Sequence, residues 1–338
     1  MKTITSLAAL IGLSAMPIPL MAQAQAPAIP AETQVNALEA LFGVHDGFRR
    51  SHAKGICASG YFVGNTVGRT LTSASAFSGD KIPVVARFSV GGGNPKASDK
   101  GKSARGLALQ FTLPKGERWL MSNLSAPVFF VSRPEQFEGF LTARVPDPAT
   151  GKPDPVKLKA FNDANAETLL QSAYFASNPV PASYAAVSYW GVHAFEFISA
   201  QGQSQFVRWQ FVPEKGTLGL TDDEVKSLPT DFLAGELGNR LAQAPAVFDF
   251  KLQLAEKGDT LTDPTKVWPE NRLVLPAGKL VIDKTQPIAA CDAITFIPLV
   301  LPNGIKPSAD PVLRARSASY ATSLNRSRRA APPAAKQP

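Results

Sequence analysis

Two short stretches near opposite ends of the chain hold the residue types with the most distinctive chemistry. In the first, His52 follows Arg49 and Arg50, which places a proton-transfer group beside two permanent positive charges. In the second, Tyr320 follows Arg316 by four residues, a spacing that puts both side chains on one face of a helix. A phenol ordinarily ionises at a pH of about 10, and a neighbouring guanidinium favours its ionised form. Tyr320 is therefore a candidate metal ligand.

A helix is predicted around Tyr320, because Asp310 suits the N-cap position and Pro311 the first turn. Alternation of apolar and polar residues predicts strands at 81–89, 195–198, 206–211 and 248–254. The second and third of these flank a short polar segment and indicate a hairpin. Helical spacing recurs at 31–44, after position 154 and at 221–228. Together these elements predict an α+β fold with an antiparallel sheet or barrel.

Composition limits the classes of function. Apolar residues make up 44% of the chain, enough to build a sizeable core in one large domain or two small ones. The net charge of +8 comes largely from basic residues after position 310, and no basic stripe with interleaved aromatic residues occurs elsewhere. Nucleic-acid binding is therefore not expected. The sequence has no HExxH motif, no Cys/His cluster and no GxSxG motif, which argues against a zinc site and against a nucleophile-elbow hydrolase.

The N-terminus predicts a secretory signal peptide. Lys2 precedes an apolar run over 7–21, and Ala22-Gln23-Ala24 suits a cleavage site, so residues 1–24 are expected to be removed. A membrane anchor is the alternative, but Pro17 and Pro19 interrupt a run that is short for a membrane span. The mature protein is expected to be periplasmic and free of the membrane. The Ala/Pro-rich tail, 330–338, is expected to be disordered.

The two cysteines, Cys57 and Cys291, lie far apart and form no CxxC motif. In an exported protein they could form one disulfide. Both have apolar neighbours, and two buried free thiols fit the sequence equally well, so the pairing stays open.

The stretch at 49–55 resembles the segment of the catalase family that holds the distal histidine. His52 stands at that histidine and Arg49 at an arginine that binds a haem propionate. The sequence Arg87-Phe88-Ser89 is similar to a family motif in which the arginine meets a propionate and the serine supports the histidine. These matches assign Arg49, Arg87 and Ser89 to cofactor binding.

Further matches follow in the family's order, from about residue 42 to residue 320. Residues 127–130 resemble an aromatic run on the distal side that includes Phe129, and Phe137 falls where a phenylalanine packs on the haem. His193 matches a histidine beside the pocket. Tyr320, with Arg316 one helical turn earlier, stands at the tyrosinate that binds the haem iron.

The resemblance implies an α+β fold over residues 32–329: a catalase-like antiparallel eight-stranded β-barrel with surrounding helices and haem inside. The implied cofactor is haem b, iron protoporphyrin IX, with Tyr320 as the metal ligand and Arg316 keeping it ionised. His52 is the implied catalytic residue. With an ordinary pKa near neutrality, it is expected to take a proton from bound peroxide and return it to the departing oxygen.

Departures from the family pattern are informative. Leu124 stands where catalases have a distal asparagine, with Asn123 one place earlier, and Gly91 stands where a valine often narrows the channel. A downstream arginine is replaced by Ser327. The long N-terminal arm and the C-terminal helical domain of typical catalases are missing. The positions aligned with the nicotinamide-cofactor site of some catalases, Leu169 and Asn178, lack the required histidine and arginine.

The sequence most resembles the catalase-related peroxidase branch. We expect a haem peroxidase that reduces hydrogen peroxide or organic hydroperoxides with a small organic electron donor and keeps weak catalase activity. Three alternatives stay open: a true small catalase, a fatty-acid hydroperoxide isomerase or dehydratase, and a non-catalytic haem carrier. Without the arm and extensions that hold catalase tetramers together, a monomer or dimer is expected.

Overall fold

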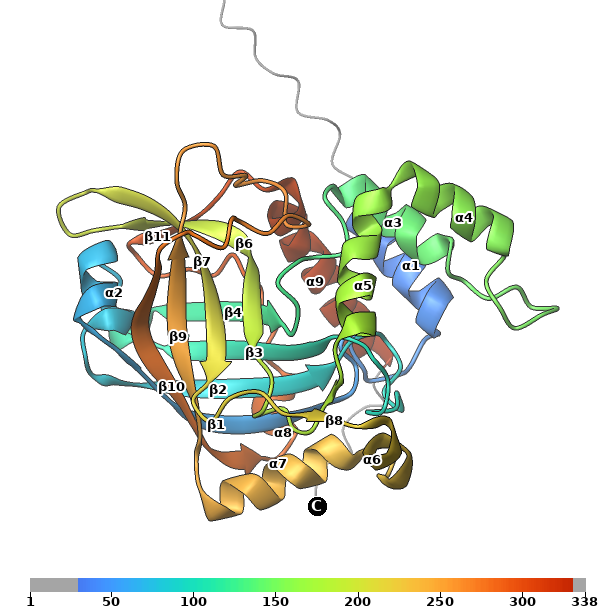
Figure 1. The fold of residues 1–338 in the computed structure, drawn as a ribbon, viewed down its shortest axis with the longest axis horizontal. Helices are drawn as coiled ribbons and strands as arrows, with labels where there is room; N and C mark the ends of the chain where they lie inside the picture. Colours follow the sequence, from blue (N-terminus) through green and yellow to red (C-terminus); the bar gives the residue numbers. More distant parts are fainter. Residues whose placement is uncertain (1–29, 331–338) are drawn as a thin grey trace, which may run out of the picture.

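The computed structural model describes residues 30–330 (Figure 1). The predicted signal peptide, 1–24, lies outside the described residues, as does nearly all of the predicted tail. None of the helices in the described part has both the length and the apolar character that a membrane span requires.

A closed antiparallel barrel of eight strands forms the centre of the molecule, as predicted (Figure 1). Around the ring the strands are β6 (Tyr189–Ile198), β4 (Arg118–Leu124), β3 (Arg105–Thr112), β2 (Lys81–Val90), β1 (Gly55–Gly64), β10 (Val274–Gln286), β9 (Ala246–Leu254) and β7 (Ser204–Pro213). The predicted hairpin is β6–β7, and the pairing between these two strands closes the ring. Outside the ring, β11 (Ile305–Pro307) pairs with β6, and β5 (Val180–Pro181) pairs with β8 (Gly219–Leu220).

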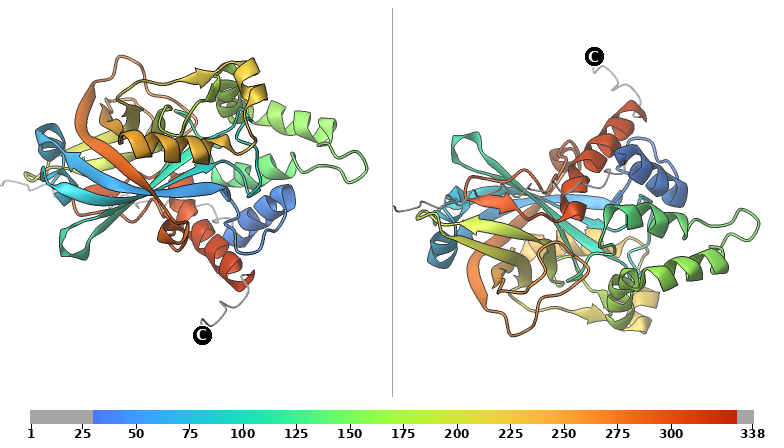
Figure 2. Two further views of the ribbon diagram at one scale, coloured as in Figure 1. Left: turned by 90° about the horizontal axis from the view of Figure 1, so that it is seen from below. Right: turned by 90° about the horizontal axis from the view of Figure 1, so that it is seen from above.

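Helices surround the barrel unevenly. On one side lie α1 (Ala31–Phe42), α3 (Pro134–Thr142), α4 (Pro155–Ala164) and α5 (Leu170–Ser177), next to the long terminal helix α9 (Pro311–Ala330) (Figures 1 and 2). The remaining helices are α2 (Thr66–Leu71), α6 (Asp222–Ser227), α7 (Phe232–Gln243) and α8 (Ala289–Asp292). Short 3-10 turns occur at Ser75–Phe77, Pro114–Gly116 and Ala166–Leu169. The predicted α+β class is confirmed.

Aromatic side chains fill the barrel interior. The ring of Phe62 lies 5.4 Å from that of Phe111 and 5.5 Å from that of Phe250, and Phe111 lies 5.1 Å from Trp119, measured between ring centroids. All four side chains are buried. Such close packing leaves no room for a macrocycle. The candidate cofactor residues lie on the outer face of the barrel wall, so the haem expected within this fold would lie between the wall and the surrounding helices.

The start of α9 is built as the sequence predicts. The Oδ1 atom of Asp310 accepts hydrogen bonds from the backbone N–H groups of Val312, at 2.8 Å, and Leu313, at 3.2 Å. These bonds satisfy two of the donors that a helix leaves free at its first turn. Because Asp310 is buried, this cap fixes the start of α9 inside the protein.

Cys57 and Cys291 form a disulfide. The bond connects β1 to α8, and both residues are buried with Phe296 against the outer face of the barrel. The structure thus settles a pairing that the sequence left open.

Candidate active site

The candidate site lies between the outer wall of the barrel and α9. Along β2, Val84, Ala86 and Phe88 point into the core, so strand alternation turns Arg87 and Ser89 outward. The same alternation turns Leu124 of β4 outward, into a cluster that contains Val312 of α9. The wall and the helix therefore supply opposite sides of one site.

His52 is held firmly against the wall. Its backbone has a positive φ of 52°, uncommon for a residue other than glycine, and its carbonyl accepts a hydrogen bond of 2.9 Å from Arg87. Its Nδ1 lies 2.9 Å from the Ser89 hydroxyl oxygen. A Cβ atom on Gly106 would lie 2.8 Å from that Nδ1, so glycine at this position lets the ring approach the strand. Backbone strain of this kind persists where the surroundings enforce it.

The acid–base state of His52 differs from the sequence-based expectation. Burial, joined by the positive charges of Arg87, Arg316 and Arg49, lowers the pKa of His52 to about 3. The imidazole is therefore neutral at physiological pH, ready to accept a proton, and the expected titration near neutrality is wrong.

Tyr320 and Arg316 meet on α9 as the helical spacing predicts. Nη2 of Arg316 donates a hydrogen bond of 2.6 Å to the Tyr320 hydroxyl oxygen. Burial by itself raises the pKa of Tyr320, but the charge of Arg316, hydrogen bonds from Ser122 and Arg316, and the charge of Arg49 outweigh it and lower the pKa below its ordinary value. The site thus favours the phenolate that a metal ion would bind.

A buried chain of polar side chains holds Arg316 in place. Nδ1 of His193 lies 2.6 Å from Oδ2 of Asp310, and Nε2 of His193 lies 3.0 Å from Nη1 of Arg316. Burial lowers the pKa of His193 against the opposing charge of Asp310, so the ring is neutral. It then donates to the carboxylate and accepts from the guanidinium. The sequence predicted Asp310 only as a helix cap, and nothing local indicates that it pairs with a residue 117 positions earlier.

Arg49 and Arg87 form a positively charged pair that suits anionic groups. Nη2 of Arg49 donates to the carbonyl oxygens of Cys291 and Asp292, at 3.0 and 2.7 Å. Burial and the charge of Arg49 lower the pKa of Arg87 to about 10. The buried Nε atoms of both arginines lack a hydrogen-bond partner in the described part of the chain. Nε of Arg49 lies 3.7 Å from Oδ1 of Asp292, an ion pair longer than a hydrogen bond. Two guanidinium groups in one region, each with a donor that makes no hydrogen bond, fit the two propionates of a haem.

The predicted aromatic residues separate into two environments. Phe129 is buried, and its ring centroid lies 5.8 Å from that of His193 and 5.8 Å from Cζ of Arg316, which places it at the site. Phe137 is half-buried on α3 and packs on Phe130, at 5.3 Å. Phe137 therefore reaches the site through an intervening ring.

Asn123 and Leu124 point to opposite faces of β4. The amide of Asn123 is buried in the barrel, where it donates to the carbonyl of Leu107 at 2.9 Å and accepts from the Trp209 indole at 2.7 Å. Leu124 has the opposite orientation and packs with Phe129 and its neighbours. The side chain of residue 124 that faces the site is therefore apolar.

The other departures from the family pattern also have defined places. Ser327 is buried, and its hydroxyl donates to the carbonyl of Leu324 at 2.9 Å. Gly91 begins the loop after β2. Leu169 is exposed, and Asn178 lines a separate surface cavity. Within residues 30–330, no three His, Cys, Asp or Glu side chains gather as a metal site.

Comparisons with known proteins find matches along most of the chain. The protein-family model described as Catalase matches residues 47–331. A catalase-related peroxidase of Synechococcus elongatus is 47% identical over 86% of this chain and 87% of the relative. A catalase-related peroxidase of Mycolicibacterium paratuberculosis is 35% identical over 86% of this chain and 92% of the relative. The solved catalase A of Saccharomyces cerevisiae is 25% identical, with a TM-score of 0.75, over 82% of this chain and 61% of that one.

Proposed function

This chain belongs to the catalase family, and we propose that it reduces hydrogen peroxide or organic hydroperoxides with an organic electron donor, retaining weak catalase activity. Both catalase-related peroxidases described above match along most of their length. The family implies a haem cofactor, and haem b is the form proposed here. Bound haem supplies the iron centre at which the peroxide O–O bond breaks.

The residues at the site fit this cofactor. Tyr320 would bind the iron as a phenolate, since the Arg316 guanidinium lies 2.6 Å from its oxygen. Arg49 and Arg87 would pair with the propionates through Nε donors that make no hydrogen bond in the described part of the chain. The buried His193–Asp310 pair would keep Arg316 aimed at Tyr320.

His52 would move the proton of the peroxide. Its neutral ring would accept a proton from the peroxide and return it to the departing oxygen, which would leave as water or an alcohol. The Ser89 hydroxyl, 2.9 Å from Nδ1, fixes the ring plane and leaves Nε2 for the transfer.

The observation that carries the choice of a peroxidase is the orientation of Leu124. A catalase must hold a second peroxide molecule, and an asparagine amide can do so by hydrogen bonding. Here the amide of the adjacent residue, Asn123, is engaged in hydrogen bonds inside the barrel. An apolar side chain in its place favours reduction of the oxidised centre by an organic donor.

Export to a periplasm-like compartment remains a proposal that rests on the sequence of residues 1–24. The Cys57–Cys291 disulfide supports it, because such bonds persist in oxidising compartments. A monomer or dimer is proposed for the assembly, with no nucleic-acid partner.

Steady-state assays test the function. With hydrogen peroxide and guaiacol, the proposal requires donor oxidation faster than oxygen release, with peroxide consumption stimulated by the donor. Oxygen release at catalase-like rates without donor stimulation would identify a true small catalase. Conversion of a fatty-acid hydroperoxide without donor consumption would identify an isomerase or dehydratase, and bound haem without turnover would identify a carrier.

A further inference from the structure

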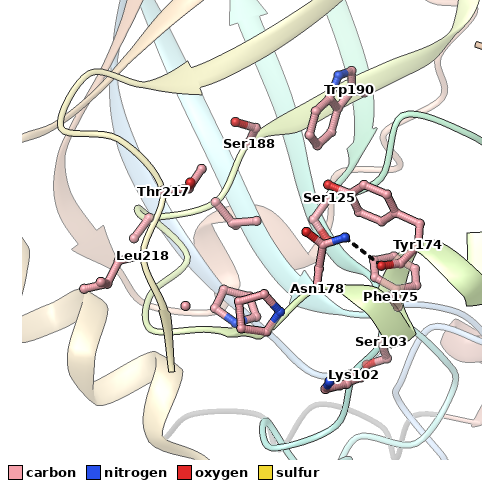
Figure 3. Close-up of a pocket in the computed structure, with 15 residues that line it drawn as sticks. Lys102, Ser103, Ser125, Tyr174, Phe175, Asn178, Ser188, Trp190, Thr217 and Leu218 are labelled. Atoms are coloured by element: carbon pink, nitrogen blue, oxygen red, sulfur yellow. Dashed lines mark hydrogen bonds between the residues drawn. The ribbon is translucent and has the colours of Figure 1, made fainter. Parts of the chain in front are cut away.

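A surface cavity of about 150 Å³ lies outside the site described above, between α5, the end of β4 and the start of β6 (Figure 3). Its lining includes the aromatic residues Tyr174, Phe175 and Trp190 and the polar residues Ser125 and Ser188. A cavity of about this size holds one benzene-sized ring. The cavity therefore suits a small aromatic ligand.

Trp190 connects this cavity to the candidate active site. Its side chain is half-buried and packs against a cluster containing Phe129 and Val192. It also lies edge-to-face with Tyr174, with ring centroids 6.2 Å apart. Its backbone pairs with that of Leu124, the residue whose side chain faces the site. One indole thus touches both the cavity and the aromatic cluster beside His193 and Arg316.

The cavity has positive charge at one end. Lys102 is the only charged residue in the lining, which contains no acidic side chain. It lies at the end of the cavity opposite Trp190 in Figure 3, with its Nζ donating to the Ala176 carbonyl at 3.1 Å. A ligand with an aromatic ring and an anionic group at the far end would match this arrangement.

We propose that this cavity binds the organic electron donor, a single-ring phenol with a carboxylate opposite its hydroxyl, and that Trp190 carries the electron inward. The inference rests on the proposed function, because that function supplies the oxidant. Each phenol gives one electron to the active site through Trp190 and its phenolic proton to water, leaving a phenoxyl radical. Two phenols provide the two electrons that, with two protons, reduce one hydrogen peroxide to two water molecules.

Binding tests the cavity without reference to turnover. Titration calorimetry on the purified haem-loaded protein would use 4-hydroxybenzoate and its neutral amide, 4-hydroxybenzamide. Lys102→Met should weaken binding of the acid about threefold to tenfold and leave binding of the amide unchanged. Lys100→Met is the matched control, since Lys100 lies in the same loop but contacts the Lys226 carbonyl. If the two variants change the affinity for 4-hydroxybenzoate equally, or if the unmodified protein does not bind 4-hydroxybenzoate, the proposed donor site is wrong.

Trp190→Phe tests the electron route. This variant keeps an aromatic wall in the cavity, and kcat for oxidation of 4-hydroxybenzoate at saturating concentration should fall about tenfold or more. The rate of the reaction with hydrogen peroxide is measured on the same variant, and the fall in kcat should exceed any change in that rate. A kcat equal to that of the unmodified protein would contradict the role of Trp190. If the unmodified protein does not react with hydrogen peroxide, the proposed function is contradicted. The calorimetric result on binding of 4-hydroxybenzoate would remain valid in that case.

NADPH provides a size control. Since the cavity holds one ring and lacks the histidine and arginine of nicotinamide-binding catalases, NADPH should not displace 4-hydroxybenzoate. Displacement with comparable affinity would contradict the choice of a single-ring ligand.

Discussion

The hydroxyl oxygen of Tyr320 lies 2.6 Å from Nη2 of Arg316, one turn earlier on the same helix. The other terminal nitrogen of that guanidinium faces His193, which is itself bound to the buried carboxylate of Asp310. Since Asp310 also caps α9, one carboxylate fixes both the start of the helix and the orientation of the arginine. This arrangement favours a phenolate at the position proposed for the iron ligand.

Replacing His52 tests the proton-transfer role. His52→Ala should bind haem normally and react with hydrogen peroxide about two to four orders of magnitude more slowly, because general acid–base help is lost. Stopped-flow absorbance of the haem band measures this rate. Ser89→Ala, which removes only the hydroxyl at Nδ1, is the control and should have a smaller effect. A His52→Ala rate equal to that of the unmodified protein would exclude the role.

The pH dependence follows from the lowered pKa of His52. The neutral ring is the active form, and a pKa of about 3 keeps it neutral at every pH above about 4. The rate of the peroxide reaction should therefore be flat between about pH 5 and pH 8. A histidine with its ordinary pKa of about 6.5 would lose roughly thirtyfold in rate at pH 5. A fall in the stopped-flow rate with its midpoint near pH 6.5 would contradict the lowered pKa of His52.

Restoring the amide tests the significance of Leu124. Leu124→Asn should raise oxygen release from hydrogen peroxide by at least about tenfold, since one hydrogen bond to a developing charge is worth two to three orders of magnitude in comparable sites. An oxygen electrode measures the release. Leu124→Ala opens similar space without adding an amide and should not reproduce the gain. If the two variants release oxygen at equal rates, an amide at position 124 does not determine catalase activity.

The disulfide should contribute to stability. It closes a loop of 234 residues, and removing such a bond typically costs about 2–5 kcal/mol. The double variant Cys57→Ser with Cys291→Ser should therefore unfold at lower urea concentration than the unmodified protein. Adding a reductant should lower the midpoint of the unmodified protein and leave that of the variant unchanged. Identical midpoints under all conditions would show that the bond adds nothing.

Local signals in the sequence predicted the elements that carry the site. Asp310 and Pro311 indicated where α9 begins, and the four-residue spacing of Arg316 and Tyr320 indicated their contact, because caps and helix faces depend on near neighbours. Barrel closure was expected only through the family resemblance. The pairing of Leu124 with Trp190, on strands far apart in the chain, has no local signal.

Side-chain environments were the part that the sequence could not give. The pKa of His52 depends on three arginines brought close by folding, and Arg316 lies on a helix at the far end of the chain. The same holds for Asn123, whose amide is satisfied by Leu107 and Trp209 on other strands. Alternation along β4 places Asn123 and Leu124 on opposite faces, but the sequence analysis predicted no strand there, and only the fold shows which face is the core.

The absorption spectrum of purified protein, compared with that of Tyr320→Phe, tests most directly whether Tyr320 binds haem iron. The unmodified protein should show the bands of high-spin ferric haem with a tyrosinate ligand. Tyr320→Phe should lose those bands or lose haem altogether, while circular dichroism shows that it remains folded. An unchanged haem spectrum in folded Tyr320→Phe would contradict the assignment, and with it the proposed arrangement of the whole site.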